Sequence, residues 1–186
     1  MKKMFVWALG STLFFGCNNE KATEAKTEAT PAATTAATTE TKTAPAEFAD
    51  AKYMDIGRKG LAALSAGDVD GWVSSYADNV VYVWNNGDSL AGKPAVTAYW
   101  KKRRTEVIDS IAFTNSVFLP IKVNQPQSVE QPGVWLLGWY KTDAKYKTGK
   151  KMSQWIHTDM HFNEADKVDR VIMYLDRAPI NAAMAK

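Results

Sequence analysis

The sequence has little cysteine: Cys17 is the only one in 186 residues. A single thiol excludes an intrachain disulfide and a metal site built from several cysteines. The sequence also lacks a glycine-rich phosphate loop, a dinucleotide-binding fingerprint and the Gly-x-Ser-x-Gly turn of serine hydrolases. Its longest apolar run, Met4–Phe15, is shorter than the roughly 20 residues that span a bilayer. These absences exclude a disulfide scaffold and give no support to nucleotide or serine-hydrolase chemistry.

The charge balance is almost even. From Glu47 onward the chain carries 18 basic and 16 acidic residues, whereas a dedicated nucleic-acid-binding domain is usually more basic. We therefore expect no nucleic-acid partner. The one short basic run, Lys101–Arg104, is either a solvated helix face or an anion-binding patch.

Aromatic residues are plentiful, with seven each of Trp, Tyr and Phe. Most of them follow Tyr53. Such a load predicts either a thick core or an aromatic-lined cavity that holds a small apolar or aromatic ligand.

The first 17 residues have the pattern of a secretory signal. Lys2 and Lys3 precede the apolar run, which ends in Gly16 and Cys17. This resembles the signal of bacterial lipoproteins, although Phe14 and Phe15 depart from its commoner start. The resemblance implies that Cys17 is lipidated and becomes the mature N-terminus. The expected location is the bacterial cell envelope, either periplasmic or surface-facing, with a lipid anchor to the membrane.

Residues 18–46 contain nine Ala and nine Thr among 29 residues, and no aromatic or large aliphatic residue. Such a segment buries too little apolar surface to offset its conformational entropy. It is predicted to be a disordered tether.

Residues 47–180 show the periodicities of a folded domain, followed by a short tail over 181–186. Helical spacing predicts helices near 48–66, 69–76 and 93–106, with a small hairpin over 80–91 between the last two. Alternating strands are expected at 110–122, 133–142, 150–163 and 167–176. Helices followed by an antiparallel meander indicate the α+β class.

Several short motifs carry a family resemblance. The piece Ala66–Trp72, followed by Tyr76–Val80 and Leu90–Lys93, resembles the opening of the nuclear-transport-factor-2-like superfamily, in particular its SnoaL-like polyketide-cyclase and ketosteroid-isomerase relatives. The ending, His161–Asn163 with Tyr174–Asp176, is similar to the last hairpin of that family. The loop over 120–132 is longer than a family hairpin requires.

This resemblance implies a conical, cystatin-like fold, with three N-terminal helices packed on a strongly curved antiparallel sheet around a pocket. It also implies a homodimer formed through the outer sheet face. In the enzymes of the family, polar pocket groups move a proton next to a carbonyl without a cofactor, so a cofactor-independent isomerase, cyclase or dehydratase is one expected function.

Alternation along the strands groups the candidate site residues, because successive side chains point to opposite faces. The candidate acid–base residues are His157, Asp159, His161 and Asp176. The candidate ligand-binding residues are Tyr82, Trp84, Trp100, Trp135, Trp139, Trp155 and Tyr174. If all of these face inward, they form an aromatic cavity with four polar groups.

Alternation does not say which way a set points. The set that contains Trp155, His157, Asp159 and His161 could instead form an interface or a solvated stripe. A metal between the two histidines is disfavoured, because alternate strand residues lie about 7 Å apart.

Three functions therefore stay open, and each makes a structural prediction. A ligand-binding module requires an apolar cavity with satisfied polar groups. An enzyme requires a carboxylate or histidine of perturbed pKa inside that cavity. An interaction module requires a filled cavity and an exposed apolar patch.

Overall fold

The computed structural model describes residues 43–127 and 131–185. The predicted signal, its Cys17 and nearly all of the predicted tether lie outside the described residues. Within the described ranges, no helix is both long enough and apolar enough to cross a membrane.

Seven strands form one sheet in the described part of the chain, in the order β1-β4-β5-β6-β7-β2-β3. Neighbouring strands are antiparallel except β2 and β7, which are parallel. The strands are β1 (Ala46–Phe48), β2 (Tyr76–Trp84), β3 (Ser89–Ala91), β4 (Ile108–Val123), β5 (Gly133–Tyr146), β6 (Lys151–Phe162) and β7 (Val168–Tyr174).

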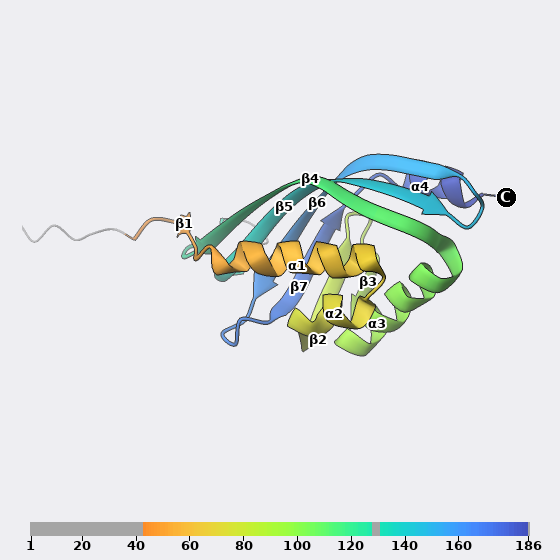
Figure 1. Ribbon diagram of the computed structural model, residues 1–186. Coiled ribbons are helices and arrows are strands. Elements are labelled where there is room, and N and C mark those ends of the chain that lie inside the picture. The colour runs from red at the N-terminus through yellow and green to blue at the C-terminus, as the bar shows by residue number, and fades with distance from the viewer. Residues whose placement is uncertain (1–42, 128–130, 186) are drawn as a thin grey trace, which may run out of the picture. The chain divides into compact units, whose positions relative to one another are not determined.

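Helices cover one face of this sheet, and we call that face the inner face and the opposite one the outer face (Figure 1). The helices are α1 (Lys52–Ala66), α2 (Val69–Trp72), α3 (Lys93–Lys102) and α4 (Arg177–Met184). Helix α1 runs beneath the arch of β4, and α4 lies near the far ends of β5 and β6. A wide turn over Arg103–Val107 leads from α3 into β4.

The register of β5, β6 and β7 sorts their side chains between the two faces. Gly138, Thr158 and Met173 lie side by side in one row, which faces inward. In the adjacent row, Trp139 pairs with His157, which pairs with Tyr174. Since neighbours along a strand point to opposite faces, this second row faces outward.

A bulge in β4 changes which of its residues face inward. Phe113 pairs with the inward-facing Thr142, but the register shifts between Thr114 and Val117. Beyond the shift, Phe118 pairs with Gly138 and faces inward. Asn115, at this bulge, has a left-handed backbone with φ 52°. The extra residue bends the strand, as bulges do, and contributes to the curvature of the sheet.

Small residues allow α1 to approach the sheet. A Cβ atom at Gly57 would lie 2.8 Å from Cε1 of Phe118 and 2.9 Å from Cδ2 of Leu136. A Cβ atom at Gly138 would also lie 2.8 Å from Phe118. The Phe118 ring therefore fits between helix and sheet because both of these residues lack a side chain.

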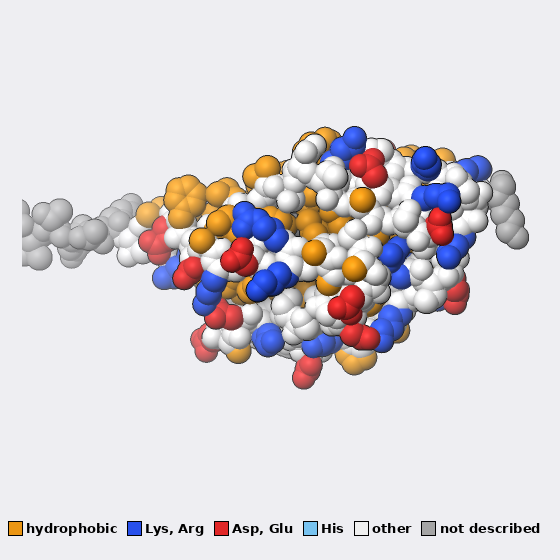
Figure 2. All heavy atoms as spheres, viewed as in Figure 1, with side chains coloured by type: hydrophobic (Ala, Val, Ile, Leu, Met, Phe, Trp, Pro, Cys, Tyr) orange, Lys and Arg blue, Asp and Glu red, His pale blue; other side chains and the backbone are white. Residues whose placement is uncertain are grey.

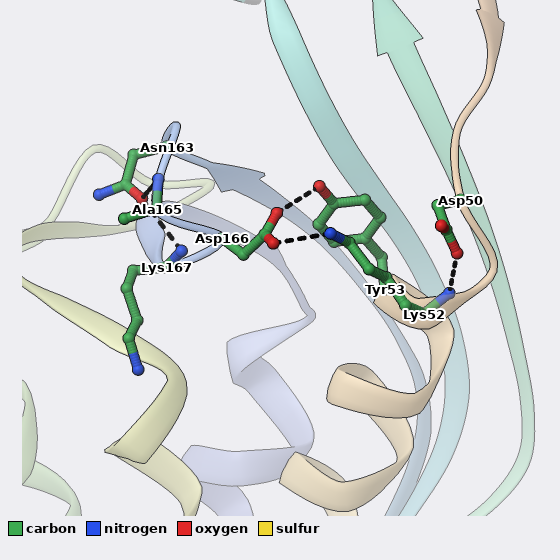
Figure 3. A network of polar contacts seen from close by, with 7 residues as sticks. All are labelled: Asp50, Lys52, Tyr53, Asn163, Ala165, Asp166 and Lys167. Carbon is green, nitrogen blue, oxygen red and sulfur yellow. Dashed lines mark hydrogen bonds and ion pairs between the residues drawn. The ribbon is translucent and has the colours of Figure 1, made fainter.

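A polar network fastens the start of α1 to the turn between β6 and β7 (Figure 3). The Asp166 carboxylate accepts hydrogen bonds of 2.6 Å from the Lys52 ammonium and from the Tyr53 hydroxyl. These two donors hold the pKa of Asp166 below its usual value, the ammonium acting most strongly. The interaction therefore supports the fold above the ordinary Asp pKa, and this support is lost as the pH falls through the lowered pKa.

The α+β expectation is confirmed as a mixed fold with a curved seven-stranded sheet, but three details differ. The sheet is mixed, because β2 pairs in parallel with β7. A fourth helix, α4, follows the strands and contains the first residues of the predicted 181–186 tail. Ala46, expected in the tether, belongs to β1 and pairs with Val123.

Residues 41–186 form one compact unit, and the whole sheet and all four described helices lie within it. The core residues also belong to this unit. Because it carries its own core, this unit is expected to fold on its own.

Replacing Gly57 by Ala should destabilise the 41–186 unit relative to Gly60→Ala, by about 1–3 kcal/mol. Both residues lie within α1, so both variants gain the same helix propensity. A Cβ at Gly60 meets only ordinary contacts, the nearest at 3.4 Å. Urea unfolding of both variants measures the difference. Equal stabilities would show that Phe118 and Leu136 move aside freely.

Candidate functional site

A cavity of about 140 Å³ lies between the inner face and the helices. Its walls are mainly aromatic and aliphatic, and include Trp72, Trp84, Trp100, Phe118 and Ile156. In Figure 2, hydrophobic side chains occupy the middle of one face of the molecule, with Lys, Arg, Asp and Glu around them. A concave apolar site with a few polar groups is the usual form of a small-molecule site.

Three tyrosines from two strands line this cavity. Tyr76 and Tyr82 belong to β2, and Tyr140 belongs to β5. Burial raises the pKa of all three, that of Tyr140 to about 12. Their mutual proximity raises the pKa of Tyr76 and Tyr82 further. At neutral pH the three hydroxyls are therefore protonated and can donate hydrogen bonds.

The hydroxyl groups that line the cavity form weak hydrogen bonds within the protein. The Tyr82 hydroxyl donates to the Met173 sulfur at 3.4 Å, and Thr158 donates to the Tyr140 hydroxyl at 3.4 Å. The Thr142 hydroxyl is buried and has no hydrogen-bond partner in the described part of the chain. An unsatisfied buried hydroxyl costs free energy, so a ligand that bonds it gains that free energy back.

The structure separates the predicted ligand-binding residues into two groups. Tyr82, Trp84 and Trp100 line the cavity, as expected. The expectation that the others share this cavity is wrong, because they lie on the outer face: Trp135, Trp139, Trp155 and Tyr174. The cause is the parallel register of β2 and β7, which places Tyr82 beside Val171 and Trp84 beside Met173.

His157 and Asp159 also lie on the outer face, outside the cavity. The His157 ring is stacked between Trp139, at 4.6 Å, and Tyr174, at 5.4 Å. Its Nε2 lies 2.7 Å from Oδ1 of Asp159 and its Nδ1 lies 3.0 Å from the Gly138 carbonyl oxygen. Partial burial raises the pKa of Asp159, and His157 opposes this rise.

His161 and Asp176 have structural contacts. His161 Nδ1 lies 2.6 Å from Asp169 Oδ1, and its Nε2 lies 3.1 Å from the Pro132 carbonyl oxygen. Asp176 caps α4 by accepting a hydrogen bond from the Ala178 amide. The predicted pocket position of all four acid–base candidates is therefore corrected, since alternation grouped the β6 residues without giving their direction. Their catalytic role stays a prediction.

The outer face has a shallow groove of about 320 Å³ beside Asp159. Its walls include Ile121, Trp135, Ile172 and Tyr174. Among the described residues, no three His, Cys, Asp or Glu side chains are grouped so as to hold a metal ion.

Sequence reasoning missed several residues that line the cavity: Tyr76, Tyr140, Thr142, Arg103 and Arg177. Tyr140 and Thr142 share a strand face with each other, opposite to Trp139. The alternation along β5 separates Tyr140 and Thr142 from Trp139. The sequence prediction assigned the aromatic-rich face of β5 to the cavity, and that face is the outer one.

No family model and no curated protein matches this chain, whereas solved structures do. A candidate polyketide cyclase from Xanthomonas campestris aligns with a TM-score of 0.57 and 14% identity, over 71% of this chain and 96% of its own. A protein of unknown function from Burkholderia pseudomallei, described as NTF2-like, aligns with a TM-score of 0.57 and 13% identity, over 74% and 100%. A candidate isomerase from Bacillus subtilis aligns with a TM-score of 0.56 and 17% identity, over 71% of this chain and 91% of its own.

The fold is the nuclear-transport-factor-2-like fold. At these identities the similarity shows the fold alone, and it agrees with the resemblance seen in the sequence. This fold hosts both enzymes and non-enzymes, so function depends on the residues of the site and not on the fold.

Tyr82→Phe should gain stability relative to the parent as the pH rises from 9 to 11. The unfolded state ionises its tyrosines from about pH 10, whereas buried Tyr82 keeps its proton. Ionisation therefore favours unfolding of the parent by on the order of 1 kcal/mol at pH 11. Urea unfolding at both pH values measures the effect. An equal difference at pH 9 and pH 11 would mean that solvent reaches the Tyr82 hydroxyl.

Proposed function

We propose that the domain binds a small, mainly apolar molecule in the inner cavity. The observation that carries this proposal is a cavity lined by aromatic side chains in which the Thr142 hydroxyl is buried without a partner among the described residues. This differs from the expectation that the polar groups of a binding cavity are satisfied within the protein. Such a group gains free energy from a ligand that carries a hydroxyl or carbonyl. The tyrosine hydroxyls nearby supply further donors.

The size of the cavity limits the ligand. A dry protein cavity of about 150 Å³ holds one benzene ring, and the cavity here is about 140 Å³. A single ring is therefore the expected occupant. Flexible methionines in the wall, Met152, Met160, Met173 and Met184, could adapt to a larger one.

Binding is supported better than proton transfer. A general base needs a pKa near the working pH, and the described residues that line the cavity include no Asp, Glu or His. The three tyrosines hold their protons too firmly to act as bases at neutral pH. An isomerase, cyclase or dehydratase would have to use the His157–Asp159 pair on the outer face instead.

The proposal includes a location. The signal-like residues 1–17 and the Ala- and Thr-rich segment after them support a lipoprotein that is anchored at Cys17 in the bacterial cell envelope. The tether would let the domain reach ligands away from the membrane surface.

A second candidate role, pairing of two copies, is favoured by the outer face. Five large hydrophobic side chains of the described residues are exposed on it: Phe48, Val117, Trp139, Trp155 and Tyr174. Exposed apolar groups gathered on one face typically mark a protein interface.

Thr142→Val should weaken the binding of phenol about fivefold to tenfold, the value of one hydrogen bond. The binding of toluene, which has no hydroxyl, should change less than twofold. Calorimetric titration of residues 41–186 measures both. Thr97→Val on α3 makes the same chemical change outside the cavity and should affect neither ligand. Failure of the parent to bind either ligand would contradict the proposed cavity function.

Residues 41–186 should form a dimer, and Trp155→Lys should convert it to a monomer. Trp155 is 57% exposed on the outer face, and a lysine there would place a charge in the interface. Light scattering coupled to gel filtration measures the mass. Ala98→Lys on α3 adds the same charge elsewhere and should leave the dimer intact. A monomeric parent would rule out pairing through this face.

A further inference from the structure

Two arginines line the cavity on the side of α4. Arg103 follows directly after α3, and Arg177 is the first residue of α4. Both side chains are partly exposed, so they lie where the cavity meets solvent. The exposed Asn181 lines the cavity on the same helix.

Aromatic rings hold both guanidinium groups. Arg103 lies over the Tyr99 ring, with its Cζ 5.7 Å from the ring centroid, and Arg177 lies over the Trp84 ring at 5.9 Å. The rings of Tyr99 and Trp84 are themselves only 5.2 Å apart. The two cations therefore lie against one pair of rings at the same end of the cavity, and this stacking restricts their planar groups.

The positive charge of Arg103 and Arg177 is not neutralised by acidic residues of the described cavity wall. No described residue that lines the cavity is acidic. Arg177 pairs with Asp88 through Nη2 at 3.1 Å, but its Nε is buried without a partner in the described structure. Arg103 has no ion pair within residues 43–127 and 131–185. Its Nη1 lies 4.0 Å from the Met184 sulfur, and its guanidinium also interacts with the Tyr146 hydroxyl, which carries no charge to neutralise it.

The adjacent basic residues behave differently. Lys101 pairs with Asp70 at 2.8 Å on the protein surface, and Arg104 donates to the Ser65 carbonyl oxygen. Lys102 is exposed and does not line the cavity. The basic run is therefore mostly a surface feature, and Arg103 alone turns toward the cavity.

We propose that the ligand is an anion, a small aromatic or cyclic carboxylate, whose ring enters the cavity and whose carboxylate lies between Arg103 and Arg177. This deepens the proposed function and rests on it. The guanidinium fork matches a carboxylate with two parallel hydrogen bonds. A ring with one carboxylate also matches the size of the cavity and the polarity of its opening.

The test compares benzoate with benzamide, its neutral counterpart of nearly equal shape, on residues 41–186. We expect benzoate to bind at least tenfold more tightly at low ionic strength. This preference should decrease as salt is added, because screening weakens a partly exposed ion pair. Titration followed by NMR or calorimetry gives both affinities.

Variants assign the preference to the two arginines. Arg103→Gln and Arg177→Gln should each lower benzoate affinity about fivefold or more and change benzamide affinity less than twofold. Arg103→Lys keeps the positive charge but lacks the planar guanidinium, so its benzoate affinity should lie between those of the parent and of Arg103→Gln. Lys102→Gln removes the same charge one residue away and should have no effect. Thermal unfolding checks that each variant is folded.

The outcomes separate this inference from the proposed function. If benzamide binds and benzoate binds no more tightly, the anion inference is wrong while the cavity function stands. If benzoate is preferred but the preference survives in the Arg103→Gln, Arg177→Gln double variant, the assignment to these arginines is wrong. If neither compound binds, both the inference and the proposed function fail.

Discussion

The register of three paired strands, β5, β6 and β7, fixes the chemistry of both faces of the sheet. It aligns Gly138, Thr158 and Met173 on the inner face. A slip of one residue would exchange this row with the neighbouring one, in which His157 is stacked between two aromatic rings. The cavity and the outer aromatic surface thus depend on the same set of backbone hydrogen bonds.

The inner face is covered by helices but is closely packed in only part of its extent. The ring of Phe118 occupies the space that side chains at Gly57 and Gly138 would take, so α1 and the sheet pack closely there. Large aromatic rings that pack against one another line another part of the wall, among them Trp84, Tyr99 and Trp100. The remaining space contains hydroxyls with few internal partners, which suits it to a ligand better than to further core.

Much of the fold could be predicted from the sequence. Helical spacing located α1 and α3, and strand alternation correctly placed His157, Asp159 and His161 on one face of β6. Motifs near both ends of the domain indicated the nuclear-transport-factor-2-like fold, which the solved structures support. These features depend on local sequence, which periodicity can report.

The cavity itself was only partly predictable, because the direction of each strand face depends on pairing between distant strands. Tyr82 and Trp84 were identified, but they were grouped with the wrong face of β6, since the parallel pairing of β2 with β7 has no local signature. The bulge in β4 further changes the alternation between Phe113 and Phe118. Arg103 could not be distinguished in the sequence from the other residues of its basic run. Of these, Lys101 pairs with Asp70 at the surface and Arg104 donates to the Ser65 carbonyl oxygen.

The proposed ligand site lies between the helices and the inner face. NMR of the 41–186 unit with methyl-labelled isoleucine and methionine, in the presence of phenol, locates the bound ligand. Binding in the cavity should give nuclear Overhauser contacts from phenol to Ile156 and Met173, which line the cavity. Contacts to Ile172, which lines the groove on the outer face, would contradict it.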